Sequence, residues 1–108
     1  MTVESFIKVA RLEDIPADAP LQVETPEGDK LALVQVEGVV YAMQDRCSHR
    51  DFPLSSGRLD DGQIECAWHG ARFDVATGRA LCLPAIRPVR VYEVKVEAGD
   101  VYVALEMD

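Results

Sequence analysis

The feature that most constrains this chain is the position of its two histidines, because each one follows a cysteine at short range. The two pairs are Cys47-Ser48-His49 and Cys66-Ala67-Trp68-His69, and residues 50–65 separate them. The pairs lie in a region, 44–83, where apolar periodicity weakens and Gly, Pro, Ser and Asp gather. A loop region of this length inside a small domain needs something that holds it together. The sequence therefore predicts a metal centre built from two loops.

On both sides of that region the chain has the pattern of β-strands. Val94 and Val96 alternate with charged residues, which indicates one buried and one wet face, and Val89 and Val91 have the opposite parity, which predicts a bulge near Val91-Tyr92. Glu37-Gly38 and Ala98-Gly99-Asp100 are typical of hairpin turns. The other predicted strands are Ser5–Ala10, Leu21–Thr25, Lys30–Val36, Val39–Met43, a last strand from Val101, and two short strands near Gln63–Ala67 and Ala71–Val75.

No segment has a helical period, and 108 residues suit one domain. We therefore expect an all-β protein with a single domain, 1–108. Residues 1–43 and 84–108 form its β framework, and residues 44–83 are the inserted loops that carry the chemistry.

Four ligands in two Cys-His pairs are compatible with two kinds of metal site. Structural zinc takes tetrahedral sites with two cysteines and two histidines. A two-iron cluster can instead be held by two thiolates on one iron and two imidazoles on the other. Zinc modules usually pair Cys with Cys and His with His, whereas each loop here pairs a Cys with a His. The mixed order favours the cluster, and a structural zinc module for protein binding remains the alternative from a different class.

The stretch from Cys47 to Asp74 resembles the Rieske family, whose pattern is Cys-x-His, a gap near this length, and Cys-x-x-His-Gly. The other matching residues are Leu54-Ser55, Gly57, the run His69-Gly70-Ala71-Arg72-Phe73-Asp74, and Leu83-Pro84-Ala85. Ala67 stands where many members have Pro. Phe52 and Ala67 occupy the regions of the extra disulfide cysteines of the cytochrome bc type, and Cys82 has no partner, so the resemblance is to the disulfide-free ferredoxins that serve aromatic-ring dioxygenases.

The resemblance implies an antiparallel β-sandwich or barrel of the Rieske type with a cluster-binding insert. It implies one 2Fe–2S cluster per chain, and the ligands are Cys47, His49, Cys66 and His69. It also places five residues around the cluster, namely Ser48, Arg50, Trp68, Gly70 and Pro84.

The resemblance further implies an electron carrier in aromatic hydrocarbon catabolism, which is not itself an enzyme. It would take single electrons from a flavin reductase and pass them to a terminal ring-hydroxylating oxygenase. The alternative within this fold is a small subunit of another redox enzyme, such as nitrite reductase. Rieske centres span roughly −150 to +300 mV, and Ala71 stands where a bc-type protein tends to have a serine donor. We therefore expect a potential in the low part of that range.

The charge of the chain further limits the kinds of partner that it can bind. A formal net charge of −8 argues against nucleic acid, because binding there depends on neutralising phosphates. Met1–Ser5 lacks a basic, apolar leader, and no run of about 18 apolar residues exists. We expect a monomer in the cytoplasm that does not bind membranes.

Overall fold

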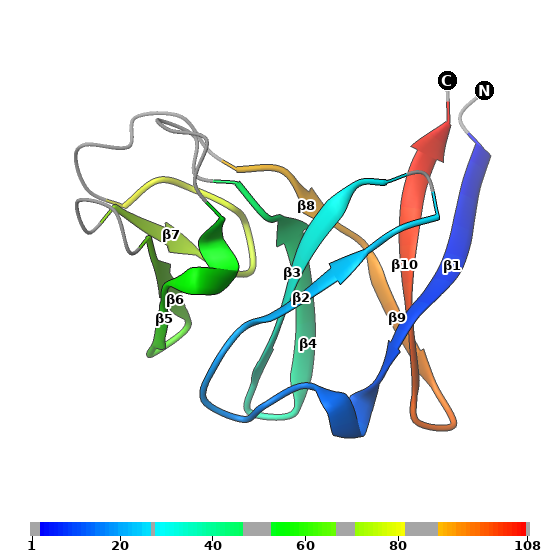
Figure 1. Cartoon of the computed structure of the whole chain (residues 1–108), viewed down its shortest axis with the longest axis horizontal. Helices are drawn as coiled ribbons and strands as arrows, with labels where there is room; N and C mark the ends of the chain where they lie inside the picture. The colour runs from blue at the N-terminus through cyan, green and yellow to red at the C-terminus, as the bar shows by residue number, and fades with distance from the viewer. Residues whose placement is uncertain (1–2, 27, 47–52, 67–70, 82–88, 108) are drawn as a thin grey trace.

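The computed structural model describes residues 3–26, 28–46, 53–66, 71–81 and 89–107, and all its sheets are antiparallel (Figure 1). The described elements, in chain order, are β1 (Val3–Arg11), the 3₁₀ turn η1 (Leu12–Asp14), β2 (Leu21–Glu24), β3 (Lys30–Val36), β4 (Val39–Gln44), the 3₁₀ turn η2 (Leu54–Ser56), β5 (Arg58–Asp60), β6 (Gln63–Glu65), β7 (Arg72–Asp74), β8 (Val91–Tyr92), β9 (Val94–Glu97) and β10 (Asp100–Met107). The predicted all-β fold is confirmed. No described helix is long and apolar enough to cross a membrane.

The strands form three sheets. Sheet A has the order β1-β10-β9, sheet B the order β2-β3-β4-β8, and sheet C the order β5-β6-β7. Figure 1 shows sheets A and B together, which we call the framework, and sheet C to one side of them. β1 begins beside the end of β10, and the two strands pair along most of their length.

The sequence explains why sheet B lies between two hydrophobic cores. Strand β3 carries the unbroken apolar run Leu31–Val34, and all four residues are buried. Because side chains alternate across a strand, Leu31 and Leu33 enter a core with Val101 and Val103 of sheet A. Ala32 and Val34 enter a second core. Its other buried members are Met43, Leu54, Ile64, Cys66, Ala71, Phe73, Val75 and Val89. Sheet B therefore packs against sheet A on one face and against sheet C on the other.

Three tight hairpins join neighbouring strands, and each contains a glycine preceded by another residue in the left-handed region. The pairs are Glu37-Gly38, Asp61-Gly62 and Ala98-Gly99, with φ between 48° and 83°. Two such residues in succession form the turn whose twist matches that of the flanking strands. The predicted turn at Glu37-Gly38 is confirmed, and the last strand begins at Asp100, which the sequence placed in the turn.

The predicted bulge near Val91-Tyr92 is wrong. Val91 and Tyr92 pair with β4 in sheet B, whereas Val94 pairs with Val103 of β10 in sheet A. The parity changes at Glu93 because the chain leaves one sheet there and enters the other, so the two segments face different neighbours. The register instead shifts between Lys8 and Ala10 of β1, where the sequence predicted an unbroken strand.

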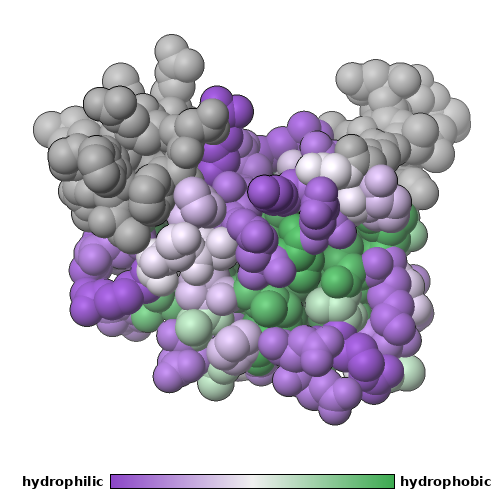
Figure 2. All heavy atoms as spheres, viewed as in Figure 1, coloured by the Kyte–Doolittle hydropathy of each residue, from purple (hydrophilic) through white to green (hydrophobic). Residues whose placement is uncertain are grey.

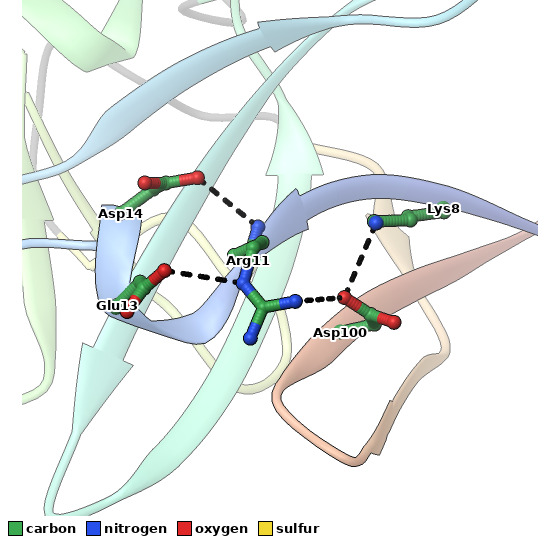
Figure 3. A network of polar contacts seen from close by, with 5 residues as sticks. All are labelled: Lys8, Arg11, Glu13, Asp14 and Asp100. Carbon is green, nitrogen blue, oxygen red and sulfur yellow. Dashed lines mark hydrogen bonds and ion pairs between the residues drawn. The ribbon is translucent and has the colours of Figure 1, made fainter.

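Short polar contacts fasten the turn η1 to the end of sheet A (Figure 3). The Arg11 guanidinium lies 3.1 Å from a carboxylate oxygen of Glu13 and 3.0 Å from one of Asp100, which also lies 3.2 Å from Lys8 Nζ. The Arg11 amide donates to Asp14 at 3.2 Å. Exposed ion pairs of this kind contribute little to stability.

Figure 2 shows a hydrophobic area on the same view of the molecule, over the region between β1 and β2.

Candidate metal centre

Of the four predicted ligands, the structure describes Cys66. Cys47, Ser48, His49 and Arg50 fall in residues 47–52, and Trp68, His69 and Gly70 fall in residues 67–70, both outside the described residues. Pro84 and Cys82 lie in residues 82–88, which are also outside them. Within the described ranges no group of three or more Cys, His, Asp or Glu is placed to hold a metal. The geometry of the site must therefore be read from the residues on either side of these three segments.

Cys66 lies directly after β6 and is 1% exposed. Its amide donates to the carbonyl of Ala71 at 2.7 Å, so the residues before and after segment 67–70 are joined by a hydrogen bond. Arg72, the first residue of β7, pairs with Glu65 of β6 in the ladder. The second Cys-His pair of the sequence therefore belongs to the connection 66–71 between two paired strands, and Cys66 is its first residue.

All three segments start or end at the same hydrophobic core. Leu54 follows the first segment closely, Cys66 and Ala71 bracket the second, and Val89 follows the third. These four residues share one core with Phe73, whose ring is fully buried. Residues far apart in the sequence thus share one core.

Two glycines allow the backbone to approach closely around this core. A Cβ atom on Gly57 would lie 1.8 Å from the carbonyl oxygen of Glu65, the residue before Cys66. A Cβ on Gly78 would lie 2.1 Å from the carbonyl oxygen of Val89, whose amide donates to Gly78 O at 2.8 Å. Separations this short exclude any side chain. Gly57 therefore fixes the chain after the first segment against the strand that leads to Cys66.

A polar cluster joins the two ends of the first segment. Asp45 is 8% exposed, and its carboxylate accepts hydrogen bonds from the amide of Ser55 at 2.6 Å and from the Ser55 hydroxyl at 2.6 Å. The side-chain amide of Gln22, on β2, donates to the same carboxylate at 2.5 Å. No motif in the sequence points to Asp45 as a residue of the site. The available signal was an acidic residue between an apolar strand and the first cysteine.

Arg72, which precedes Phe73, holds sheet C together at its surface. Its Nε lies 3.0 Å from a carboxylate oxygen of Glu65, and its guanidinium also reaches Gln63 at 3.2 Å and Asp60 at 3.7 Å. Each of these partners comes from β5 or β6. Because Arg72 is tied across the sheet, its main role in the structure is to connect the three short strands.

A polar groove of about 540 Å³ runs beside the first segment. The lining residues are Gln22, Gly28, Asp29, Lys30, Gln44, Asp45, Arg46, Pro53, Arg90 and Tyr92. Burial raises the pKa of the Tyr92 hydroxyl, and the Arg90 guanidinium, 5.2 Å from the centre of its ring, opposes part of that rise. The phenol therefore stays protonated at neutral pH. Arg46 and Pro53 are the described residues next to segment 47–52, so the groove adjoins the predicted site.

Cys66 and its surroundings fit a metal ligand of the predicted kind. A thiolate is a ligand for both zinc and iron–sulfur clusters. The buried position of Cys66 at the base of a tight connection restricts its motion and keeps water away, both of which favour a stable metal–thiolate bond. Of the four predicted ligands, the one that the structure describes therefore has surroundings that suit a cluster.

Comparison with known proteins agrees with this geometry. Residues 5–93 match the family model described as Rieske [2Fe-2S] domain. The chain is 43% identical over 102 residues to the naphthalene 1,2-dioxygenase system ferredoxin component of Pseudomonas aeruginosa, covering 94% of this chain and 97% of that protein.

Two solved structures share the fold along almost the whole chain. The ferredoxin of Sphingomonas yanoikuyae B1 superposes with a TM-score of 0.89 at 30% identity, covering 94% of this chain and 99% of that one. The second, at 37% identity and a TM-score of 0.85 with 92% of each chain covered, comes from a complex of reduced oxygenase and oxidized ferredoxin in carbazole 1,9a-dioxygenase. The cofactor class predicted from the sequence, a Rieske-type 2Fe–2S cluster, and the role of electron carrier rather than enzyme are confirmed.

Proposed function

Because this chain belongs to the Rieske family, we propose that Cys47, His49, Cys66 and His69 hold its cluster. We propose further that it carries single electrons from a flavin reductase to a terminal ring-hydroxylating oxygenase. The observation that carries the proposal is the position of Cys66, which is buried in a core with Leu54, Ala71 and Val89 and joined to Ala71 by a hydrogen bond.

The types of donor support this set of ligands. Two thiolates and two imidazoles are the ligands of a Rieske centre, and the bound cluster supplies a site that accepts and returns one electron. The residues around Cys66 exclude water from its side, and its amide is held by the carbonyl of Ala71. Ser48, Arg50, Trp68, Gly70 and Pro84 stand next to the proposed ligands in sequence or in the family pattern, and we assign them to the surroundings of the cluster.

The partner proteins follow from the relatives and from charge. The carbazole dioxygenase complex pairs a related ferredoxin with its oxygenase, and we extend that pairing to this chain. The net charge of −8 favours partners with basic surfaces near their own redox centres. We propose that the chain acts as a monomer in the cytoplasm, as one domain in which residues 1–43 and 84–108 frame the loops 44–83, with a potential in the low part of the Rieske range.

Substitution of the described ligand tests the proposal. The purified protein should contain two irons and two sulfides per chain, absorb in the visible range, and give the low g-average EPR signal of a reduced Rieske centre. Cys66→Ser should abolish all three properties. Ser56→Ala provides a control, because Ser56 lies near the same region on an exposed surface. A Cys66→Ser protein with the native spectrum would refute the ligand assignment, and a colourless protein that contains zinc would refute the function.

The electron path needs a separate test. With a flavin reductase and a ring-hydroxylating oxygenase, the loaded protein should restore product formation that stops when it is omitted, and its potential should be negative or near zero in a redox titration. A strongly positive potential would contradict the expected branch. The proposed partners would be contradicted if the protein restored no turnover in any dioxygenase system in which it replaces the native ferredoxin.

A further inference from the structure

Asp45 is a charged residue in a position where a charge is costly. Among the described residues, Thr25 and Asp45 are the buried polar side chains, and Asp45 is the one that can ionise. A buried carboxylate is tolerated when hydrogen-bond donors surround it. Asp45 receives three donors within 2.6 Å. Bonds this short are typical of those that a carboxylate accepts, so both oxygens of Asp45 are held in place by donors from other parts of the chain.

The donors connect parts of the chain that the first segment separates. Asp45 precedes segment 47–52, and Ser55 follows it in η2. The Asp45 amide donates to the carbonyl of Lys30 at 3.0 Å, which attaches the start of the segment to β3, and Gln22 attaches the carboxylate to β2. The chain before the segment, at Asp45, and the chain after it, at Ser55, are thus fastened to one another and to sheet B. Holding the ends of a loop together reduces the conformations available to it.

The carboxylate is also close to the proposed cluster along the chain. Asp45 is two residues before Cys47, so their Cα atoms are separated by about 7 Å or less. A buried negative charge near a cluster opposes the addition of an electron, because the low polarisability of a protein interior strengthens charge interactions. The Asp45 carboxylate should therefore lower the reduction potential of a cluster bound through Cys47.

We propose that Asp45 is a positioning residue for the cluster. It clamps the ends of the segment that carries Cys47 and His49, and it favours the oxidised state through its charge. This inference rests on the ligand set proposed above. It assigns a role to a buried residue that is not one of the proposed iron ligands.

Three variants test the clamp in the complete, cluster-loaded protein. In Asp45→Asn the amide oxygen can still accept from the Ser55 amide, and the side chain of Gln22 can turn to match it, so cluster retention should stay close to that of the wild type while the potential rises. In Asp45→Ala the clamp is lost, and iron release to a chelator should be roughly 10- to 100-fold faster. Asp29→Asn is the control, because Asp29 lines the same groove but is exposed. It removes an equal charge and should leave both properties unchanged.

The readouts separate positioning from a merely structural role. If Asp45 served folding alone, Asp45→Asn would keep the wild-type potential, and that result overturns the proposal even if Asp45→Ala fails to fold. An equal rise in potential in Asp29→Asn also overturns it, since net charge would then suffice. If the wild type holds no cluster, or Cys66→Ser keeps it, the proposed ligand set fails instead. A loaded wild type with a shifted Asp45→Asn and an unshifted Asp29→Asn supports the clamp.

Discussion

The framework and the sheet C region, residues 53–66 and 71–81, are built by different means. The framework has strands of up to nine residues, and its core comes from side chains that alternate regularly along them. Each strand of sheet C has three residues. The sheet C region is held by a core shared with sheet B, by glycines that admit close backbone contacts, and by turns with polar side chains. The comparison indicates that regular strand pairing supports the first region, whereas irregular contacts support the region that positions the proposed ligands.

Removal of the cluster should produce the largest difference in amide protection between the two regions. Because metal binding and folding are coupled, the apoprotein should lose amide protection in β5, β6 and β7 while β3, β4 and β10 remain protected. Hydrogen exchange with and without iron measures this. Equal protection of sheet C in both forms would mean that the irregular contacts suffice without the metal.

Truncation of the two cores should have the next largest effect. Phe73→Ala and Leu33→Ala each remove a fully buried side chain. The expected cost in stability is about 3–5 kcal/mol for Phe73→Ala and about 2–5 kcal/mol for Leu33→Ala. Phe73→Ala should also release the cluster, whereas Leu33→Ala should mainly lower the melting temperature of the framework. Thermal unfolding followed both by far-UV circular dichroism and by visible absorption distinguishes the regions. Coincident losses in both variants would show that the two cores unfold as one.

Substitution of a glycine in close backbone contact should change stability by a smaller amount. Gly57→Ala places a methyl group 1.8 Å from the Glu65 carbonyl and should destabilise the sheet C region by about 3 kcal/mol. Gly38→Ala in the framework is the matched control, because nothing lies within 4 Å of its added methyl and only the left-handed backbone resists it, at about 1 kcal/mol. Cluster retention and denaturant midpoints measure both. If Gly57→Ala had no effect, the chain at Gly57 and strand β6 would be able to move apart at little cost.

The polar network of Figure 3 should matter least. Asp100→Asn removes the negative charge that Lys8 and Arg11 share. The expected cost is about 0.5 kcal/mol, further reduced at high salt, because both cations are exposed. Denaturant unfolding at low and high salt measures it. A loss that salt does not change would show that the contact acts by packing rather than by charge.

Much of the framework was predictable because its signals are local. The apolar run of β3 and the Glu37-Gly38 turn specify a hairpin without help from the rest of the chain. The passage of the chain at Glu93 from sheet B to sheet A was not predictable, since a parity change in the sequence looks the same for a bulge and for a change of sheet. Strand β5 was missed because three residues with mixed character carry no periodic signal.

The sequence by itself determined the family, the cofactor and the proposed ligands, because metal chemistry depends on residue type and spacing, which are written along the chain. Only the tertiary structure revealed that Cys66 is buried at the base of a closed connection and that Asp45 joins both ends of the first segment. Those features depend on contacts between residues that are distant in sequence, such as Gly57 with Glu65 and Asp45 with Gln22. Hydrogen bonds and close packing of this kind arise only when the strands have been brought together.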